Sequence, residues 1–160
     1  MSTPKTNAMR MLDKTGINYK VHSYNPDAGT DGIQVAAQIG QSTNSVFKTL
    51  VTQGDDRQVY VFVIPMDREI DLKAAARSVG AKSIQMAPHK DLLALTGYMK
   101  GGCSPVGMKK RYPTVIDRSA GELTTMIVSA GKIGLQVELA PSDLLAVTGA
   151  AYGDMVTPAS

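Results

Sequence analysis

Residues 100–110 read KGGCSPVGMKK, and no regular helix or strand accommodates this sequence. Glycine leaves the backbone unconstrained, whereas Pro105 lacks a backbone N–H and fixes its own φ angle. We therefore predict a shaped loop at residues 101–107. Such a loop brings backbone N–H groups close to a ligand, and the lysines at both ends favour an anionic or carbonyl-bearing one. An ordinary connecting turn with solvated lysines is equally compatible with the composition.

A β-hairpin is predicted upstream of this loop, with strands at residues 46–52 and 58–65. The second strand is apolar on both faces, which is typical of a central strand. Lys48 is the anomaly in the first strand, because its neighbours are apolar or β-branched. Such a lysine either extends to water or faces a pocket, and a rigid strand places a site residue accurately.

The rest of the chain alternates short helices with short strands. We expect helices from Thr3-Pro4 to Gly16, at residues 33–39 and, capped by Asp71, at residues 72–79. Strands are expected at residues 17–24, 114–117, 126–129 and 135–139. The remaining segments are a surface loop at 25–32, a glycine turn at 129–134 and a loosely held tail at 150–160. The pattern predicts a single mixed α/β domain over residues 1–160. Its centre would be a mixed, largely antiparallel or barrel-like β-sheet, flanked by short helices.

Two segments of the chain resemble each other: residues 87–97 and residues 140–149 both follow a short strand with a proline, a helix and a glycine. Ordinary strand-to-helix junctions use the same residues, and this interpretation is preferred to a true duplication. Asp143, in the second segment, is then expected to cap the helix.

Composition limits the possible functions. The 160 residues include 17 Lys and Arg, 14 Asp and Glu, one Cys and no Trp, with a net charge of +3. This mild basic excess is compatible with a polyanionic partner, while an aromatic platform for bases is not expected. The lone cysteine cannot form an internal disulfide, and no apolar run has the length of a membrane span. We expect a cytoplasmic protein without membrane contact.

Several common catalytic systems have no counterpart in the sequence. Cys103 lacks a histidine close by in sequence, and Ser104 does not lie in a GxSxG elbow. His22 and His89, the only histidines, form no recognisable zinc set with a single cysteine. Walker-type and GxGxxG nucleotide motifs are missing too. We therefore expect neither a metal nor a cofactor.

The sequence resembles the YbaK-type editing deacylases, freestanding relatives of the prolyl-tRNA synthetase editing domain. Residues 101–107 are similar to their GGxSPxG motif, and residues 46–51 are similar to their lysine strand. Further matching segments extend from His22-Ser23-Tyr24 to residues 140–144, in the same order. The likeness thus covers nearly the whole chain.

The resemblance implies an activity and a set of site residues. It implies hydrolysis of cysteine mischarged onto proline tRNA, in which the thiol of the substrate's own cysteine attacks the ester. By the same likeness, Lys48 would hold the carbonyl or terminal nucleotide, Tyr24 would bound the aminoacyl pocket, Gly101 and Gly102 would offer N–H donors, and Asp143 would lie opposite. Further substrate-binding residues would be Thr49, Ser104, Pro105, Gly107, Ser129 and Gly131.

The resemblance also implies partners and leaves alternatives open. The partners would be aminoacylated proline tRNA and, in a transient complex, prolyl-tRNA synthetase. The enzyme could instead act on another small amino acid, such as alanine, although residues 101–107 follow the cysteine pattern. A noncatalytic module that binds tRNA or the synthetase is the alternative from another class.

Overall fold

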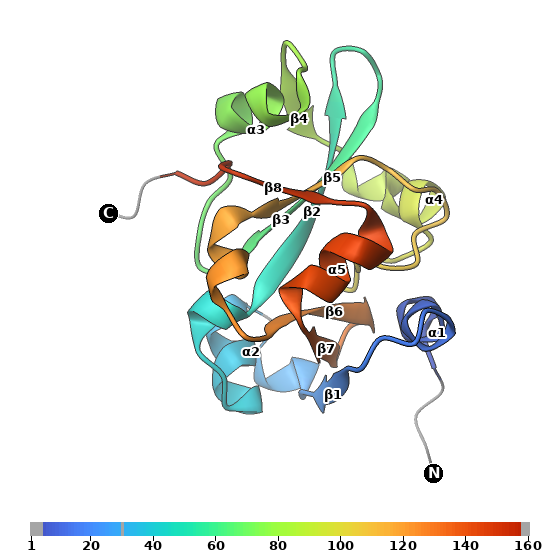
Figure 1. Cartoon of the computed structure of the whole chain (residues 1–160), viewed down its shortest axis with the longest axis vertical. Helices are drawn as coiled ribbons and strands as arrows, with labels where there is room; N and C mark the ends of the chain where they lie inside the picture. Colours follow the sequence, from blue (N-terminus) through green and yellow to red (C-terminus); the bar gives the residue numbers. More distant parts are fainter. Residues whose placement is uncertain (1–4, 30, 158–160) are drawn as a thin grey trace.

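The computed structural model describes residues 5–29 and 31–157. Its larger sheet has five strands in the order β4-β2-β3-β5-β8 (Figure 1). The predicted hairpin is confirmed: β2 (Phe47–Gly54) pairs antiparallel with β3 (Val59–Pro65), and β3 is buried along its whole length. The other members are β4 (Ile84–Met86), β5 (Thr114–Asp117) and β8 (Ala151–Gly153). Both β3–β5 and β5–β8 are parallel, so the sheet is mixed.

The smaller sheet is antiparallel, in the order β1-β7-β6. Its strands are β1 (Lys20–Ser23), β6 (Met126–Lys132) and β7 (Leu135–Leu139). A parallel bridge between Val46 and Ile127 connects the two sheets. The predicted mixed α/β fold is confirmed, with the strands divided between two sheets rather than gathered in one.

Five α-helices surround the sheets in the described part of the chain: α1 (Asn7–Lys14), α2 (Gly32–Ile39), α3 (Leu72–Val79), α4 (Leu92–Thr96) and α5 (Pro141–Thr148). The main core lies between the sheets, where Phe47 and Val63 of the larger sheet meet Val128 and Val137 of the smaller one. Leu12 of α1 and Leu144 of α5 also pack there. A second core, beneath α3, covers the opposite face of the larger sheet.

Helix ends follow the predicted chemistry. The side chain of Asp71 accepts from the N–H groups of Lys73 and Ala74 at the start of α3, and Asp31 accepts from Gln34 at the start of α2. Gly40 adopts the left-handed conformation that ends α2, with φ +71°. The length and position of α2 are therefore set by its own end residues.

Several predicted boundaries were wrong. Helix α1 begins at Asn7, capped by Thr6, whereas Thr3 and Pro4 lie outside the described residues. Strand β1 is shorter than residues 17–24, and β6 continues through the predicted glycine turn to Lys132, with a bulge after Ser129. The tail is not loose up to residue 157, since β8 joins the sheet and Met155 is fully buried. Of the described helices, none has the length and apolar character needed to cross a bilayer.

Candidate active site

A cavity of about 370 Å³ lies where β2, the β6–β7 hairpin, the start of α2 and the glycine loop meet. Its wall is formed by residues that lie far apart in the sequence: Tyr24, Asp31, Gly32, Phe47, Lys48, Thr49, Met66, Gly101, Cys103, Ser129 and Gln136. Five of the predicted site residues are thus brought together: Tyr24, Lys48, Thr49, Gly101 and Ser129. A smaller cavity of about 150 Å³ shares Thr49, Gly101 and Cys103 with it.

Lys48 supplies positive charge to the cavity wall. It pairs with Ile64 in the β2–β3 ladder and is half-buried. Within residues 5–29 and 31–157, the only salt bridges are Lys5–Asp13, His22–Glu138 and Arg118–Asp154, so Lys48 has no acidic partner. A half-buried ammonium without a counter-ion attracts a carbonyl or an anion. Lys48 lines the cavity, as one of its two predicted interpretations requires, and its role there stays a prediction.

The glycine loop contributes backbone donors through Gly101 and Cys103. In the described part of the chain, the N–H groups of these two residues, which line the cavity, have no backbone acceptor. Gly102 differs, because its N–H donates to the carbonyl of Met99 at 3.0 Å. The expectation that Gly102 offers a donor is therefore wrong for this conformation.

Residues 104–107, the second half of the glycine loop, do not line the cavity. The hydroxyl of Ser104, which is fully buried, accepts from the N–H of Val106 at 3.2 Å. Pro105 and Gly107 face a different cavity, of about 270 Å³, on the side of α1 and α5. These three predicted substrate-binding residues shape the loop.

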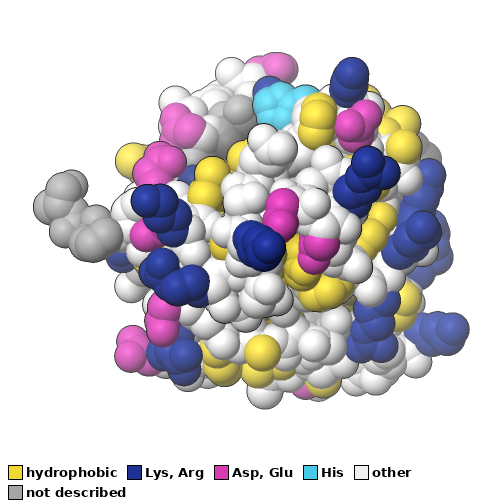
Figure 2. Space-filling model, turned by 90° about the horizontal axis from the view of Figure 1, so that it is seen from above, with side chains coloured by type: hydrophobic (Ala, Val, Ile, Leu, Met, Phe, Trp, Pro, Cys, Tyr) yellow, Lys and Arg dark blue, Asp and Glu magenta, His cyan; other side chains and the backbone are white. Residues whose placement is uncertain are grey.

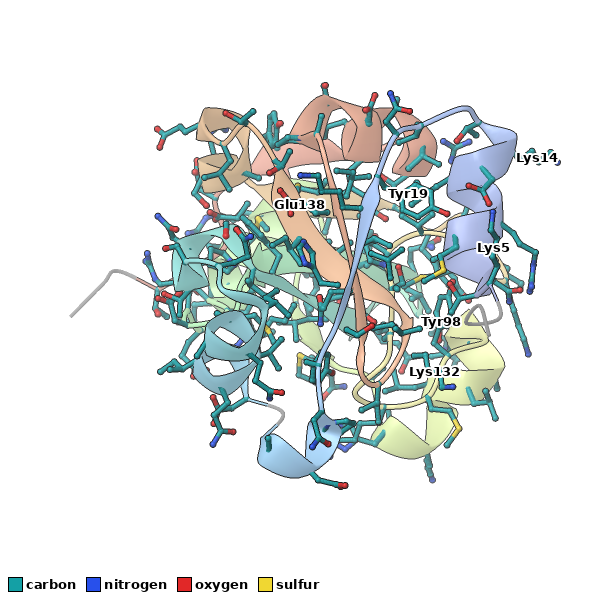
Figure 3. All side chains as sticks on the ribbon, turned by 90° about the horizontal axis from the view of Figure 1, so that it is seen from below. Lys5, Lys14, Tyr19, Tyr98, Lys132 and Glu138 are labelled. Atoms are coloured by element: carbon teal, nitrogen blue, oxygen red, sulfur yellow. The ribbon has the colours of Figure 1, made fainter. Side chains whose placement is uncertain are left out.

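Gly131 also has a supporting position. Its φ is +98°, and an added Cβ would lie 2.6 Å from Cε1 of Tyr98. The Tyr98 hydroxyl donates to the carbonyl of Val106 at 2.6 Å, and burial raises the pKa of this phenol well above its ordinary value. Figure 3 shows Tyr98 beside the end of β6 that carries Lys132. Gly131 thus lets the Tyr98 ring hold the glycine loop against β6.

Two polar atoms of the cavity wall are buried without a hydrogen-bond partner in the described structure: Oγ1 of Thr49 and Oε1 of Gln136. Sequence analysis missed Gln136, along with Asp31, Gly32, Phe47 and Met66. The available signal was the alternation of β7, which places Gln136 and Glu138 opposite the face of Leu135 and Val137. A polar face of a strand commonly meets solvent, but Gln136 is only 5% exposed.

Residues 28–147 match the family model described as an aminoacyl-tRNA editing domain. The chain belongs to this family. The resemblance predicted from residues 46–51 and 101–107 is therefore confirmed.

Several similar proteins have names connected with proline tRNA or prolyl-tRNA synthetase. EbsC of Enterococcus faecalis, provisionally named a Cys-tRNA(Pro)/Cys-tRNA(Cys) deacylase, is 42% identical over 96% of this chain and 94% of EbsC. A proline–tRNA ligase of Shouchella clausii is 28% identical over 78% of this chain and 21% of the ligase. A solved structure described provisionally as a trans-editing enzyme for prolyl tRNA synthetase has a TM-score of 0.86 at 25% identity, and the match covers 98% of this chain and 100% of that one.

Asp143 is set apart from the cavity of this editing domain. It lies in the first turn of α5, where its N–H donates to the carbonyl of Ala140 at 3.0 Å. Ala140, and not Asp143, is the N-cap, so the predicted capping role is wrong. Asp143 does not line the cavity of Lys48 either.

A polar cluster on the smaller sheet involves His22, which belongs to one of the segments that match the family. Its Nε2 lies 2.6 Å from Oε1 of Glu138, and the hydroxyl of Thr125 donates to Oε2 at 2.5 Å. The hydrogen bonds from Thr125 and His22 lower the pKa of Glu138. Figure 3 shows Glu138 on β7 of the smaller sheet. His22 is therefore engaged with Glu138, while Tyr24 reaches the cavity of the editing domain.

Cys103 lines the cavity, but its environment does not favour a nucleophilic thiolate. Burial raises the pKa of the Cys103 thiol to about 11, despite an opposing hydrogen bond with Thr96. Catalytic thiols instead have a depressed pKa or a neighbouring base. Among the described residues, no group of three His, Cys, Asp or Glu side chains is arranged to hold a metal ion.

Proposed function

We propose that this protein is a trans-editing deacylase that cleaves the ester of cysteine mischarged onto proline tRNA. The observation that carries the proposal is one cavity lined by Lys48, Gly101 and Cys103: among the described residues, Lys48 has no acidic partner and the two N–H groups have no backbone acceptor. A cation and N–H donors stabilise the negative charge that develops on an ester carbonyl during cleavage. The 42% identity to EbsC supports the choice of substrate.

The cavity suits the aminoacyl end of a tRNA. Its volume of about 370 Å³ is at the small end for ligand sites. An amino acid fits there with its ribose at the mouth, while the tRNA body stays outside. Tyr24 bounds the aminoacyl group, and Thr49 and Ser129 also line the cavity.

The reaction needs no protein nucleophile. The substrate thiol attacks its own carbonyl carbon, so a C–S bond forms while the ester C–O bond to the ribose breaks. The thiol proton ends on the released ribose oxygen, and cysteine leaves as its thiolactone, which water then opens. Lys48 and the loop N–H groups hold the carbonyl oxygen, and the cavity wall fixes the orientation of the thiol.

Cys103→Ala is expected to leave deacylation unchanged within a few-fold, because the attacking sulfur belongs to the substrate. With a pKa of about 11, only about one thiol in ten thousand is ionised at neutral pH. Iodoacetamide should accordingly label Cys103 much more slowly in the folded protein than in the unfolded one. Loss of turnover in a folded Cys103→Ala variant, or a cysteine ester trapped on Cys103, would require another mechanism.

The substrate is tested with a small panel: cysteine and alanine on proline tRNA, and cysteine on cysteine tRNA. We expect cysteine to be released from both tRNAs by the isolated protein, and alanine to be retained. Rapid release of alanine would make the enzyme an alanine editor. Tight tRNA binding without release of any amino acid would favour the noncatalytic module.

Binding of tRNA is expected to be weak, salt-sensitive and unselective in the isolated protein. Figure 2 shows Lys and Arg side chains gathered along one edge of the face that it displays, and Lys100, Lys109 and Lys110 are exposed around the glycine loop. Such charges neutralise phosphates without reading bases, so affinity falls as salt rises. Added prolyl-tRNA synthetase should then favour the proline tRNA substrate. Strong discrimination between the two tRNAs by the isolated protein would contradict the expectation that the synthetase supplies the tRNA selectivity.

A further inference from the structure

We propose that Gln136 binds the α-ammonium group of the aminoacyl ester at the enclosed end of the cavity. Gln136 would then restrict the substrates to aminoacyl esters with a free amino group. This inference rests on the proposed function, because it takes the ligand of the cavity to be an aminoacyl ester.

Burial places Gln136 at the enclosed end. It is 5% exposed, whereas Tyr24, Lys48, Thr49 and Ser129 are each half-buried. The narrow amino-acid end of the substrate therefore meets Gln136, while the nucleotide remains near the more exposed residues at the mouth. Gln136 is also the only residue in the wall with a side-chain carboxamide.

The carboxamide oxygen of Gln136 lacks a partner because its neighbours on the sheet are engaged elsewhere. In the ladder, Gln136 pairs with His22 on β1 and with Ser129 on β6. His22 binds Glu138, and the hydroxyl of Ser129 accepts from the N–H of Gly131 at 3.1 Å. A buried carbonyl without a donor is destabilising, so a ligand that supplies one gains affinity.

The chemistry of the substrate selects the ammonium group as that donor. A cysteine thiol donates weakly, whereas an ammonium carries three strong donors, and its hydrogen bonds are charge-assisted. Rotation about the broad final torsion of glutamine can present the oxygen to the cavity. Thr49, whose Oγ1 is also buried without a partner in the described structure, is a further acceptor in the cavity wall. Asp31, whose Oδ1 accepts from the N–H of Gln34, also lines the cavity.

The test replaces Gln136 with methionine, which has a similar shape and no hydrogen-bonding amide. Two probes are used, adenosine with cysteine joined through a 3′-amide, and the same compound acetylated on its α-nitrogen. Binding is measured by calorimetry at about pH 6.5, where the α-amino group of the first probe is charged. The wild-type protein should bind the free amine about 10- to 100-fold more tightly than the acetylated probe, and Gln136→Met should lose most of that preference.

A stability measurement separates this role from a structural one. Gln136→Met removes an unsatisfied buried group, so its melting temperature should equal or exceed that of the wild type. The control is Thr52→Val, because Thr52 is fully buried with its hydroxyl bonded to the carbonyl of Tyr60 at 2.9 Å. That variant should melt about 2–4 °C lower and keep the preference for the free amine.

The possible outcomes are distinct. Wild-type affinity of Gln136→Met for the free amine, or equal losses for both probes, would overturn the assignment of Gln136. Selective loss of amine binding would uphold it. If the wild-type protein showed this selectivity but cleaved no mischarged tRNA, the assignment of Gln136 would stand and the proposed deacylase function would fall.

Discussion

Deacylation of cysteine from proline tRNA is expected to fall by about 10²–10³-fold when Lys48 is replaced by alanine. The ammonium of Lys48 has no acidic partner among the described residues, so its charge is free to act on the ester carbonyl. Since the side chain is only half-buried, its removal leaves the β2–β3 ladder in place. The variant should therefore fold normally. Single-turnover rates and thermal melting, measured side by side, check both statements.

Lys73→Ala is the matched control for Lys48→Ala. Lys73 is exposed on α3, which packs on the larger sheet away from the cavity. The Lys73→Ala substitution removes the same charge from the protein as Lys48→Ala, so any general loss of tRNA affinity appears in both variants. A folded Lys48→Ala protein that turns over at the rate of the Lys73→Ala control would rule out the proposed role of Lys48.

Gly131→Ala should lower the free energy of unfolding by about 2–5 kcal/mol. Alanine at a φ of +98° is strained, and its Cβ would displace the ring of Tyr98. The buried hydrogen bond from Tyr98 to the carbonyl of Val106 would then be lost. Because that bond holds the glycine loop, deacylation should also fall. Denaturant unfolding gives the stability change directly.

Gly40→Ala separates backbone strain from the collision with Tyr98. Gly40 has a φ of +71°, but no atom lies within 4 Å of an added Cβ. Its replacement should cost only the left-handed backbone penalty of about 1–2 kcal/mol, and turnover should be unchanged. Equal losses of stability in the two variants would show that the contact between Gly131 and Tyr98 does not support the loop.

Local patterns predicted the elements that depend on local chemistry. The β2–β3 hairpin followed from its apolar alternation, and α3 followed from Asp71 at its start and Gly80 at its end. Lys48 was found because a charged residue among apolar neighbours in a strand is conspicuous. The positions of Tyr24 and Gly101 near Lys48 were implied by family resemblance alone, since spacing along the chain does not bring them together.

Residues whose role depends on tertiary contacts were not predictable in this way. The face of β7 that carries Gln136 is covered by distant segments, so alternation alone suggested exposure to solvent. Gly131 and Gly102 belong to motifs that suggest ligand contact, yet one accommodates Tyr98 and the other bonds to Met99. A glycine motif alone does not distinguish a residue that touches a ligand from one that permits close packing.

The pairing of strands that lie far apart in the sequence has a consequence for biosynthesis. Strand β8 completes the larger sheet beside β5, the N–H of Asp71 donates to the carbonyl of Met155, and β1 cannot pair until β7 exists. While β7 and β8 are still inside the ribosomal exit tunnel, neither sheet can be complete. Contacts between such distant segments form slowly. Until both strands have emerged, the edges of β1 and β5 remain open to chaperones.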